Sequence, residues 1–136
     1  MKKTVLVLED EVAVMKLMRQ ILERYTIIEA KTAEEGLLVF IDHNCRIDLL
    51  IADLTLPKLS GLQVALHLRS KLPNLPVIVT SGYPLSSWKV RDSADLERLG
   101  PTLVNLLEKP FRAEALFNAV HNLIGMPGSA EVARTA

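Results

Sequence analysis

The sequence has few cysteines, few aromatic residues and no excess of charge of either sign. Its 136 residues include a single cysteine, and aromatic residues make up 4%. Cys45 alone cannot form an internal disulfide or a paired-cysteine metal motif. The 16 Lys and Arg residues equal the 16 Asp and Glu residues in number. Neutralising phosphates needs a surplus of basic side chains, so we expect no nucleic-acid partner.

Long hydrophobic runs are also missing. A transmembrane helix needs roughly 18 or more consecutive apolar residues, and the purely apolar strings here, such as residues 5–8, are far shorter. The basic N-terminus resembles the start of a signal peptide, but the acidic residues at 9–11 interrupt the apolar stretch that follows it. The sequence therefore predicts no membrane contact and a cytoplasmic location.

The composition is that of one globular domain. Hydrophobic residues make up 49% of the chain and charged residues 24%, which is enough apolar surface for a core. Gly125 and Pro127 end the last predicted helix, and small and polar residues follow. We expect a domain over residues 1–124 and a flexible tail or linker remnant over residues 125–136.

Short apolar runs alternate with segments of helical spacing. The runs, which predict five strands, are residues 5–8, 25–28, 47–52, 76–79 and 103–107. Three of them are apolar at nearly every position, which is typical of parallel strands that helices cover on both faces. The alternation predicts an α/β fold with a doubly wound parallel sheet.

The segments between these strands show helical periodicity. The apolar residues that share predicted helix faces are Val14, Leu17, Met18 and Ile21; Ala33, Leu37, Phe40 and Ile41; Leu62, Ala65 and Leu66; and Leu116, Phe117, Val120, Leu123 and Ile124. Thr32 with Glu35, and Ser60 with Gln63, fit reciprocal capping boxes. Residues 84–100 predict one irregular helix that charged residues interrupt.

Polar residues follow four of the five predicted strands. These residues are Glu9 and Asp10, Asp53, Thr80 and Ser81, and Glu108, Lys109 and Pro110. Because the carboxyl ends of parallel strands lie along one edge of the sheet, we expect the side chains to form a single constellation. It would contain three carboxylates, a hydroxyl and an ammonium group.

Carboxylates gathered in this way need a counter-charge. Two charges about 5 Å apart cost roughly 3 kcal/mol at an effective dielectric constant near 20. A hard divalent cation with oxygen ligands relieves this repulsion, and a partly hydrated cluster suits Mg²⁺. Zinc does not fit, because His43, His67 and His121 are scattered along the chain.

These motifs together resemble the receiver domain of two-component response regulators. The motifs are the Glu9-Asp10 pair, the run of residues 53–61, Thr80 at the end of its strand, and Lys109-Pro110-Phe111. The resemblance covers Lys3 to Ile124. It implies a flavodoxin-like, or CheY-like, five-stranded sheet in the order 2-1-3-4-5.

The resemblance also implies roles for individual residues. Asp53 would be the phosphoacceptor, Lys109 would stabilise the phosphoryl oxygens, and Thr80 would bind the phosphoryl group after transfer. The implied Mg²⁺ ligands are Asp10, Asp53, the backbone carbonyl of Thr55, and Glu9 through a water molecule. The Lys109-Pro110 bond would be cis.

The implied function is signalling and not turnover of a substrate. The phosphoryl donor would be a sensor histidine kinase or a histidine phosphotransfer protein. The downstream protein would bind the face made by the fourth helix, fifth strand and fifth helix, and a homodimer is left open. Receivers of this family commonly carry an aromatic residue where this chain has Leu106. The run of residues 80–83 resembles receivers attached to hybrid histidine kinases, so an excised module is an alternative.

Three other readings stay open. A flavodoxin-like electron carrier needs a phosphate-binding loop after the first strand, where the acidic residues at 9–11 would repel a phosphate. An aspartyl phosphohydrolase usually has a second Asp two residues after its nucleophile, where this chain has Thr55. A scaffold that no longer accepts phosphate is the third reading, although every expected acidic, hydroxyl and lysine position is present.

Overall fold

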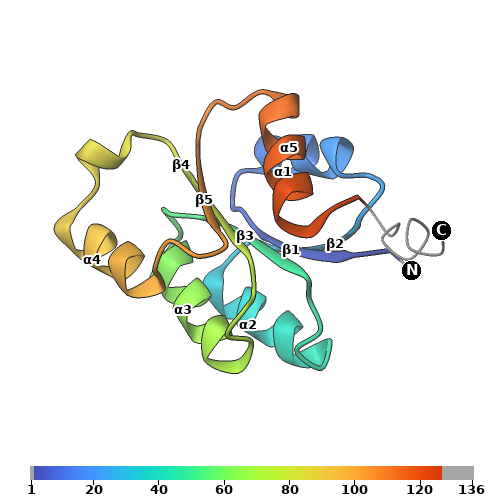
Figure 1. The fold of residues 1–136 in the computed structure, drawn as a ribbon, viewed down its shortest axis with the longest axis horizontal. Coiled ribbons are helices and arrows are strands. Elements are labelled where there is room, and N and C mark those ends of the chain that lie inside the picture. The colour runs from blue at the N-terminus through green and yellow to red at the C-terminus, as the bar shows by residue number, and fades with distance from the viewer. Residues whose placement is uncertain (1, 127–136) are drawn as a thin grey trace.

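The computed structural model describes residues 2–126, which form a central sheet between two layers of helices (Figure 1). The strands are β1 (Thr4–Leu8), β2 (Thr26–Ala30), β3 (Leu49–Asp53), β4 (Val77–Ser81) and β5 (Val104–Glu108). Each strand is parallel to its neighbours, and the order across the sheet is β2-β1-β3-β4-β5. The predicted doubly wound parallel sheet and its strand order are confirmed.

The helices divide between the two faces of the sheet. Helices α1 (Val12–Ile21) and α5 (Ala113–Ile124) cover one face, and α2 (Ala33–Asp42), α3 (Gly61–Lys71) and α4 (Val90–Leu99) lie on the other side (Figure 1). Each layer has its own apolar core against the sheet. Within residues 2–126, no helix has the length and apolar character that a bilayer crossing requires.

The central strands β3 and β4 are buried at every position. This burial explains why their sequences do not alternate between polar and apolar residues. Four of the five strands end one or two residues later than predicted, because polar residues continue the ladder. Asp53 pairs in register with Thr80, and Ser81 pairs with Glu108. The sheet itself therefore holds the polar residues that lie within the strands, whereas Glu9, Asp10 and Lys109 follow the ends of their strands.

The predicted core face of α1 is partly wrong. Leu17 is 41% exposed, whereas Met15 and Met18 are buried against the sheet. The sheet and α5 bury a narrower stripe of α1 than the apolar spacing predicts. Leu17 instead lies beside the side chains that follow β5.

The two predicted capping boxes differ in the structure. Ser60 and Gln63 form the full reciprocal box at the start of α3. Thr32 accepts a hydrogen bond from the backbone N–H of Glu35, but the Glu35 carboxylate accepts from the N–H of Lys31 and not from that of Thr32. The prediction for α2 is therefore confirmed for one of its two hydrogen bonds.

Residues 84–100 do not form the single irregular helix that was predicted. A short 3₁₀ turn (η1, Leu85–Ser87) is followed by Trp88 and then by the regular helix α4. Trp88 is 9% exposed and belongs to the same core cluster as Leu99. The buried indole separates the two elements, and the charged residues lie within α4 instead of interrupting it.

The end of α5 is attached to the start of β2. The hydroxyl of Tyr25 donates a hydrogen bond to the carbonyl of Gly125, which ends the helix with φ of 80°. Most of the predicted C-terminal tail, residues 127–136, lies outside the described residues.

Candidate functional site

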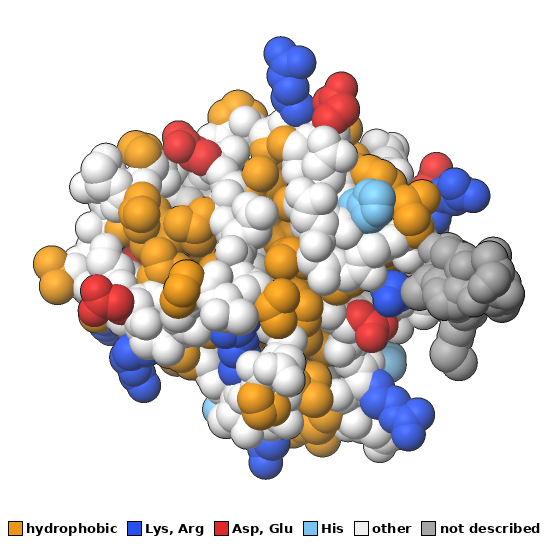
Figure 2. Space-filling view, viewed as in Figure 1, with side chains coloured by type: hydrophobic (Ala, Val, Ile, Leu, Met, Phe, Trp, Pro, Cys, Tyr) orange, Lys and Arg blue, Asp and Glu red, His pale blue; other side chains and the backbone are white. Residues whose placement is uncertain are grey.

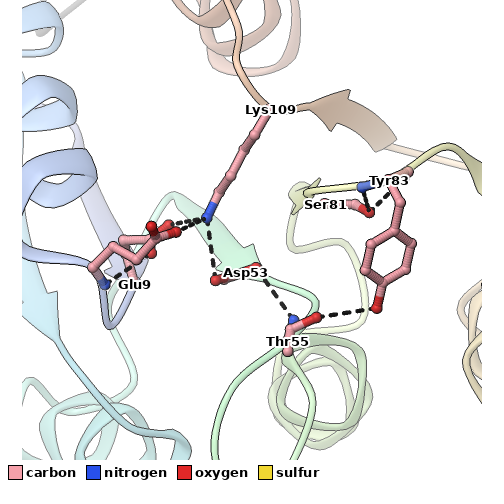
Figure 3. Close-up of polar contacts among 7 residues, drawn as sticks. Glu9, Asp53, Thr55, Ser81, Tyr83 and Lys109 are labelled. Carbon is pink, nitrogen blue, oxygen red and sulfur yellow. Dashed lines mark hydrogen bonds and ion pairs between the residues drawn. The ribbon is translucent and has the colours of Figure 1, made fainter.

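The carboxyl ends of four strands bring the predicted polar residues to one edge of the sheet. Glu9 and Asp10 follow β1, Asp53 ends β3, Thr80 is the penultimate residue of β4, and Lys109 follows β5. Figure 3 shows the Lys109 side chain pointing toward both Glu9 and Asp53. Residues that are up to 100 positions apart in the sequence therefore share one site, as the strand-end argument predicts.

Asp53 is 5% exposed and is held through both of its carboxylate oxygens. Its Oδ1 accepts a hydrogen bond from the backbone N–H of Thr55 at 3.2 Å, and its Oδ2 lies 3.2 Å from Nζ of Lys109. Burial raises the pKa of Asp53 above the usual value, although the charge of Lys109 opposes this shift. The carboxylate is thus oriented and only weakly solvated.

A glycine allows α3 to begin directly against Asp53. A Cβ on Gly61 would lie 2.3 Å from the carbonyl oxygen of Asp53 and 2.8 Å from the Cβ of Ala52. The side chain of any other residue would push the helix away from the strand end or displace the backbone of Asp53. Gly61 therefore sets how closely the α3 layer approaches the site.

Lys109 is surrounded by three carboxylates. Its Nζ lies 3.0 Å from Glu9, 3.1 Å from Glu11 and 3.2 Å from Asp53. Burial lowers the pKa of Lys109, but the hydrogen bond to Glu9 and the charge of Asp53 outweigh it and raise the pKa above the usual value. The ammonium group therefore stays charged at neutral pH. The Lys109-Pro110 bond is cis, as expected.

The oxygen ligands proposed for a cation lie close together. Carboxylate oxygens of Glu9, Asp10 and Asp53 fall within 4.8 Å of one another. Glu9 is buried, and burial raises its pKa, whereas Asp10 is exposed at the rim. An all-oxygen cluster with one exposed ligand fits a hard cation that keeps part of its water shell, as Mg²⁺ does.

The backbone carbonyl of Thr55 is the remaining member of the predicted ligand set. This carbonyl lies in the loop after β3, and within residues 2–126 it accepts no hydrogen bond from a backbone N–H. The ligand role that the resemblance to receiver domains implies for this carbonyl stays a prediction.

Thr80 carries a buried hydroxyl without a partner. The residue is fully buried, and its Oγ1 has no hydrogen-bond partner in the part of the chain that the structure describes. An unpaired buried polar group costs roughly 1–3 kcal/mol, so such a group calls for an explanation. Thr80 is the register partner of Asp53 on the neighbouring strand, at the same edge of the sheet.

Two residues of this site were not predicted to have a role. Glu11 binds Lys109 through its carboxylate. The hydroxyl of Tyr83 lies 3.2 Å from the hydroxyl of Thr55, and Figure 3 shows these two side chains facing each other. Glu11 belongs to the acidic run at 9–11, which was a signal for its role. Tyr83 reaches the site only through the path of the loop after β4, which the sequence alone does not reveal.

Comparison with known proteins agrees with this geometry. The family model of the response regulator receiver domain matches residues 5–121. The chain belongs to this family. It is 35% identical over 113 residues to the response regulator GtcR of Aneurinibacillus migulanus, and the aligned region covers 82% of this chain. Receiver domains act as signalling phosphoacceptors, bind Mg²⁺ at an acidic pocket, and interact with histidine kinases or phosphotransfer proteins and with downstream effectors.

Solved receiver structures show the same fold. A receiver domain protein from Clostridium thermocellum matches with a TM-score of 0.74 at 28% identity, over 90% of this chain and 94% of its own. The receiver domain of the hybrid histidine kinase CckA matches with a TM-score of 0.71 at 28% identity, over 89% of this chain and 98% of its own. The chain spans 43% of the length of GtcR, so it matches only one part of that protein.

Proposed function

We propose that this chain accepts a phosphoryl group on Asp53 in a two-component phosphorelay. The receiver unit would span residues 1–124 and work in the cytoplasm. The observation that supports this proposal most is the pairing of Asp53 with Thr80. A buried, oriented carboxylate lies opposite a buried hydroxyl that has no partner within residues 2–126.

The transfer exchanges one bond to phosphorus for another. A carboxylate oxygen of Asp53 forms a bond to phosphorus while the bond between phosphorus and the imidazole nitrogen of the donor breaks. The electron pair of the broken bond stays on the imidazole. Lys109 holds a positive charge 3.2 Å from Asp53, where the transferring oxygens carry negative charge. The Thr55 N–H keeps the carboxylate oriented for attack.

The acidic cluster would bind Mg²⁺ through Asp10, Asp53 and the carbonyl of Thr55, with Glu9 acting through a water molecule. When bound, the ion would offset the repulsion between the anionic carboxylates and an anionic phosphoryl group. Glu9 already has a second task, because it holds Lys109 at 3.0 Å and accepts a hydrogen bond from the Glu11 N–H. This arrangement keeps the lysine beside Asp53 before any phosphoryl group arrives.

Thr80 supplies the switch. After transfer, its free hydroxyl can donate to a phosphoryl oxygen, a contact that the unmodified carboxylate does not make. A contact present in only one of two states shifts the equilibrium between them. The loop after β4 would move with Thr80 and carry the change to η1 and α4.

The mouth of the site offers a surface for the phosphoryl donor. A hollow of about 400 Å³ beside Lys109 is lined by α1 and the segment that follows β5, including Val14, Leu17 and Phe111. The exposure of Leu17 has a function in this arrangement, because an apolar rim next to the charged site suits a helix that presents a phosphohistidine.

The proposed surface for the downstream protein lies between α4 and β5. A groove of about 520 Å³ runs between α4 and β5, and its apolar lining includes Leu85, Leu96, Val104 and Leu106. Figure 2 shows hydrophobic side chains gathered on the side of the molecule where α4 lies in Figure 1. We expect the effector to bind the face formed by α4, β5 and α5, whether it is another protein or a second copy of this chain.

The similarity to the CckA receiver supports a second origin for the chain. It would then be the receiver module of a hybrid histidine kinase, and its donor would be the kinase region of the same protein. The chemistry at Asp53 is the same in both cases.

The proposal is tested by labelling with a small phosphodonor. The chain is incubated with acetyl phosphate and Mg²⁺, and its intact mass is measured over time. We expect one added phosphoryl group, loss of labelling when Mg²⁺ is chelated, and no labelling of Asp53→Asn. Labelling of Asp53→Asn at the wild-type level overturns the assignment.

Asp48 offers a matched control. It lies one residue before β3, at the opposite end of the strand from Asp53, and its carboxylate accepts a hydrogen bond from the Thr4 N–H. Asp48→Asn keeps a carbonyl acceptor for this bond and should be labelled like the wild type. The pair of variants separates the loss of one reactive carboxylate from the general effect of an Asp-to-Asn change.

A further inference from the structure

The side chain of Tyr83 joins two loops across the Asp53 site. Its hydroxyl lies 3.2 Å from the Thr55 hydroxyl, so the loop after β4 is bonded to the loop after β3 (Figure 3). The backbone N–H of Thr55 is in turn bonded to Asp53 Oδ1. One residue therefore separates Tyr83 from the carboxylate that we propose as the phosphoacceptor.

The backbone of Tyr83 is tied to the segment that leads into α4. Ser81 Oγ accepts from the Tyr83 N–H at 3.1 Å and donates to the Tyr83 carbonyl at 2.6 Å. The indole N–H of Trp88 donates to the same carbonyl at 3.4 Å. Because Trp88 is buried and directly precedes the N-terminus of α4, a shift of Tyr83 acts on that helix through a packed residue.

A pocket is available next to the tyrosine ring. It has a volume of about 220 Å³, and its lining includes Tyr83, Trp88, Leu106 and Leu107. By the same measure one water molecule needs only about 10–15 Å³, so the pocket is much larger than the site of a single water molecule. Leu106, which is 37% exposed, has no ring to fill it.

We propose that Tyr83 is the positioning residue that links the Asp53 site to α4. In the unmodified protein its hydroxyl holds Thr55, as observed. When Asp53 is phosphorylated and Thr80 binds the phosphoryl group, this bond is released and the ring turns into the pocket beside Leu106. The inference rests on the proposed function of Asp53. Strand β5 carries no aromatic side chain that could move in response to phosphorylation, and we assign this movement to Tyr83.

The two parts of the tyrosine side chain then have opposite effects. The hydroxyl favours the resting arrangement, and a single hydrogen bond of this kind shifts a two-state equilibrium by about threefold to tenfold. The ring is needed for the activated arrangement, because only the ring fills the pocket. Tyr83→Phe should therefore ease activation, whereas Tyr83→Ala should uncouple it.

Trp88 provides the readout, because it is the single tryptophan of the chain. Beryllofluoride, a mimic of the phosphoryl group, is titrated in the presence of Mg²⁺ while Trp88 fluorescence is followed. We expect the half-saturating concentration to fall about threefold to tenfold in Tyr83→Phe. Thr55→Val should show a similar fall, and the double variant should show no further fall, since both changes break the same bond. In Tyr83→Ala we expect the change in Trp88 fluorescence to be lost.

The other tyrosine is a matched control. The hydroxyl of Tyr25 bonds to the carbonyl of Gly125, outside the Asp53 site. Tyr25→Phe should titrate like the wild type, which distinguishes the specific bond to Thr55 from the loss of any tyrosine hydroxyl. Circular dichroism of each variant checks that it is folded before the titration.

Two results overturn the inference while leaving the function of Asp53 intact. In the first, the Tyr83→Ala variant is labelled normally by acetyl phosphate and still shows a change in Trp88 fluorescence as large as that of the wild type. The other is an unchanged half-saturating concentration in Tyr83→Phe. If the wild-type protein is not labelled by acetyl phosphate, the proposed function fails, and the inference about Tyr83 fails with it. Mass and fluorescence measurements on the same samples distinguish these cases.

Discussion

Asp53 and Thr80 are register partners on the neighbouring strands β3 and β4, and the Thr80 hydroxyl is buried without a hydrogen-bond partner within residues 2–126. In most folded proteins a buried hydroxyl finds a partner, because leaving it unpaired costs free energy. Under the proposed function, the Thr80 hydroxyl would donate to an oxygen of a phosphoryl group attached to Asp53. The unmodified state pays a cost that phosphorylation would remove.

This relationship predicts an unusual effect of Thr80→Val. The substitution replaces the unpaired hydroxyl with a methyl group of similar shape, so the metal-free protein should gain about 1 kcal/mol in its free energy of unfolding. Urea denaturation measures this gain. Thr80→Ser is the control, because it keeps the hydroxyl and removes a buried methyl group, and it should be destabilised. A loss of stability in Thr80→Val would mean that the hydroxyl has a partner after all.

Gly61→Ala should disturb both stability and phosphorylation. The new Cβ would lie 2.3 Å from the Asp53 carbonyl oxygen, and relieving this contact requires movement of α3 or of the strand end. We expect a loss of about 1–3 kcal/mol in the free energy of unfolding and slower labelling by acetyl phosphate.

Gly82 provides the comparison for Gly61. A Cβ built on Gly82 meets no atom within 4 Å, so Gly82→Ala should stay within about 0.5 kcal/mol of wild-type stability. Equal stability of the Gly61 and Gly82 variants would show that the close approach of α3 to Asp53 can relax without cost.

The parts of the fold that follow from repeating patterns could be predicted from the sequence. Apolar runs locate the strands, and the order of elements requires parallel pairing, which brings Asp53 and Lys109 to one edge. The capping residues of α3 were predicted because Ser60 and Gln63 interact only with their own helix end. Predictions of this kind depend on local spacing or on one topological rule.

The contacts that were missed depend on three-dimensional paths. Leu17 faces outward because neighbouring elements bury a narrower stripe than its spacing predicts. The Glu35 carboxylate accepts from the N–H of Lys31 and not from that of Thr32, because the path of the chain before α2 directs the Lys31 donor toward it. Tyr83 and Trp88 meet through a turn whose conformation no periodicity encodes. The sequence thus predicts which residues the strand ends bring to the site, but not which residues of the loops also reach it.

Arg69 should be a major stabilising residue on the α3 and α4 side. Its guanidinium donates to the carbonyls of Leu75 at 2.9 Å, Leu99 at 3.0 Å, Thr102 at 2.9 Å and Leu103 at 3.3 Å. These bonds connect α3 to the segment before β4, to the end of α4 and to the turn before β5. Arg69→Ala should lose about 2–3 kcal/mol in the free energy of unfolding, because carbonyls would be left without donors.

Two variants test the geometry of this contact. Arg69→Lys keeps the charge but not the planar fork of donors, so it should recover only part of the lost stability. Lys71→Ala changes an exposed basic residue on the same helix and should stay within about 0.5 kcal/mol of the wild type. Full recovery by Arg69→Lys in urea denaturation would show that charge alone, and not the four directed bonds, holds the turn.

Glu29 of β2 should make stability depend on pH through its pairing with Arg19 of α1. The guanidinium binds the carboxylate through two donors, one at 2.9 Å, and lowers the Glu29 pKa below 4.5. A carboxyl group with a lowered pKa in the folded state adds stability above its unfolded pKa, and this stability is lost as the pH falls through the folded pKa. Both side chains are partly exposed, so the effect is small and weakens with salt.

Glu29→Gln should therefore be slightly less stable than the wild type at pH 7, and this difference should shrink in urea denaturations performed below pH 4.5. In an Arg19→Met background the Glu29→Gln change should have no such pH dependence, and a dependence that persists there would assign the shift to another neighbour.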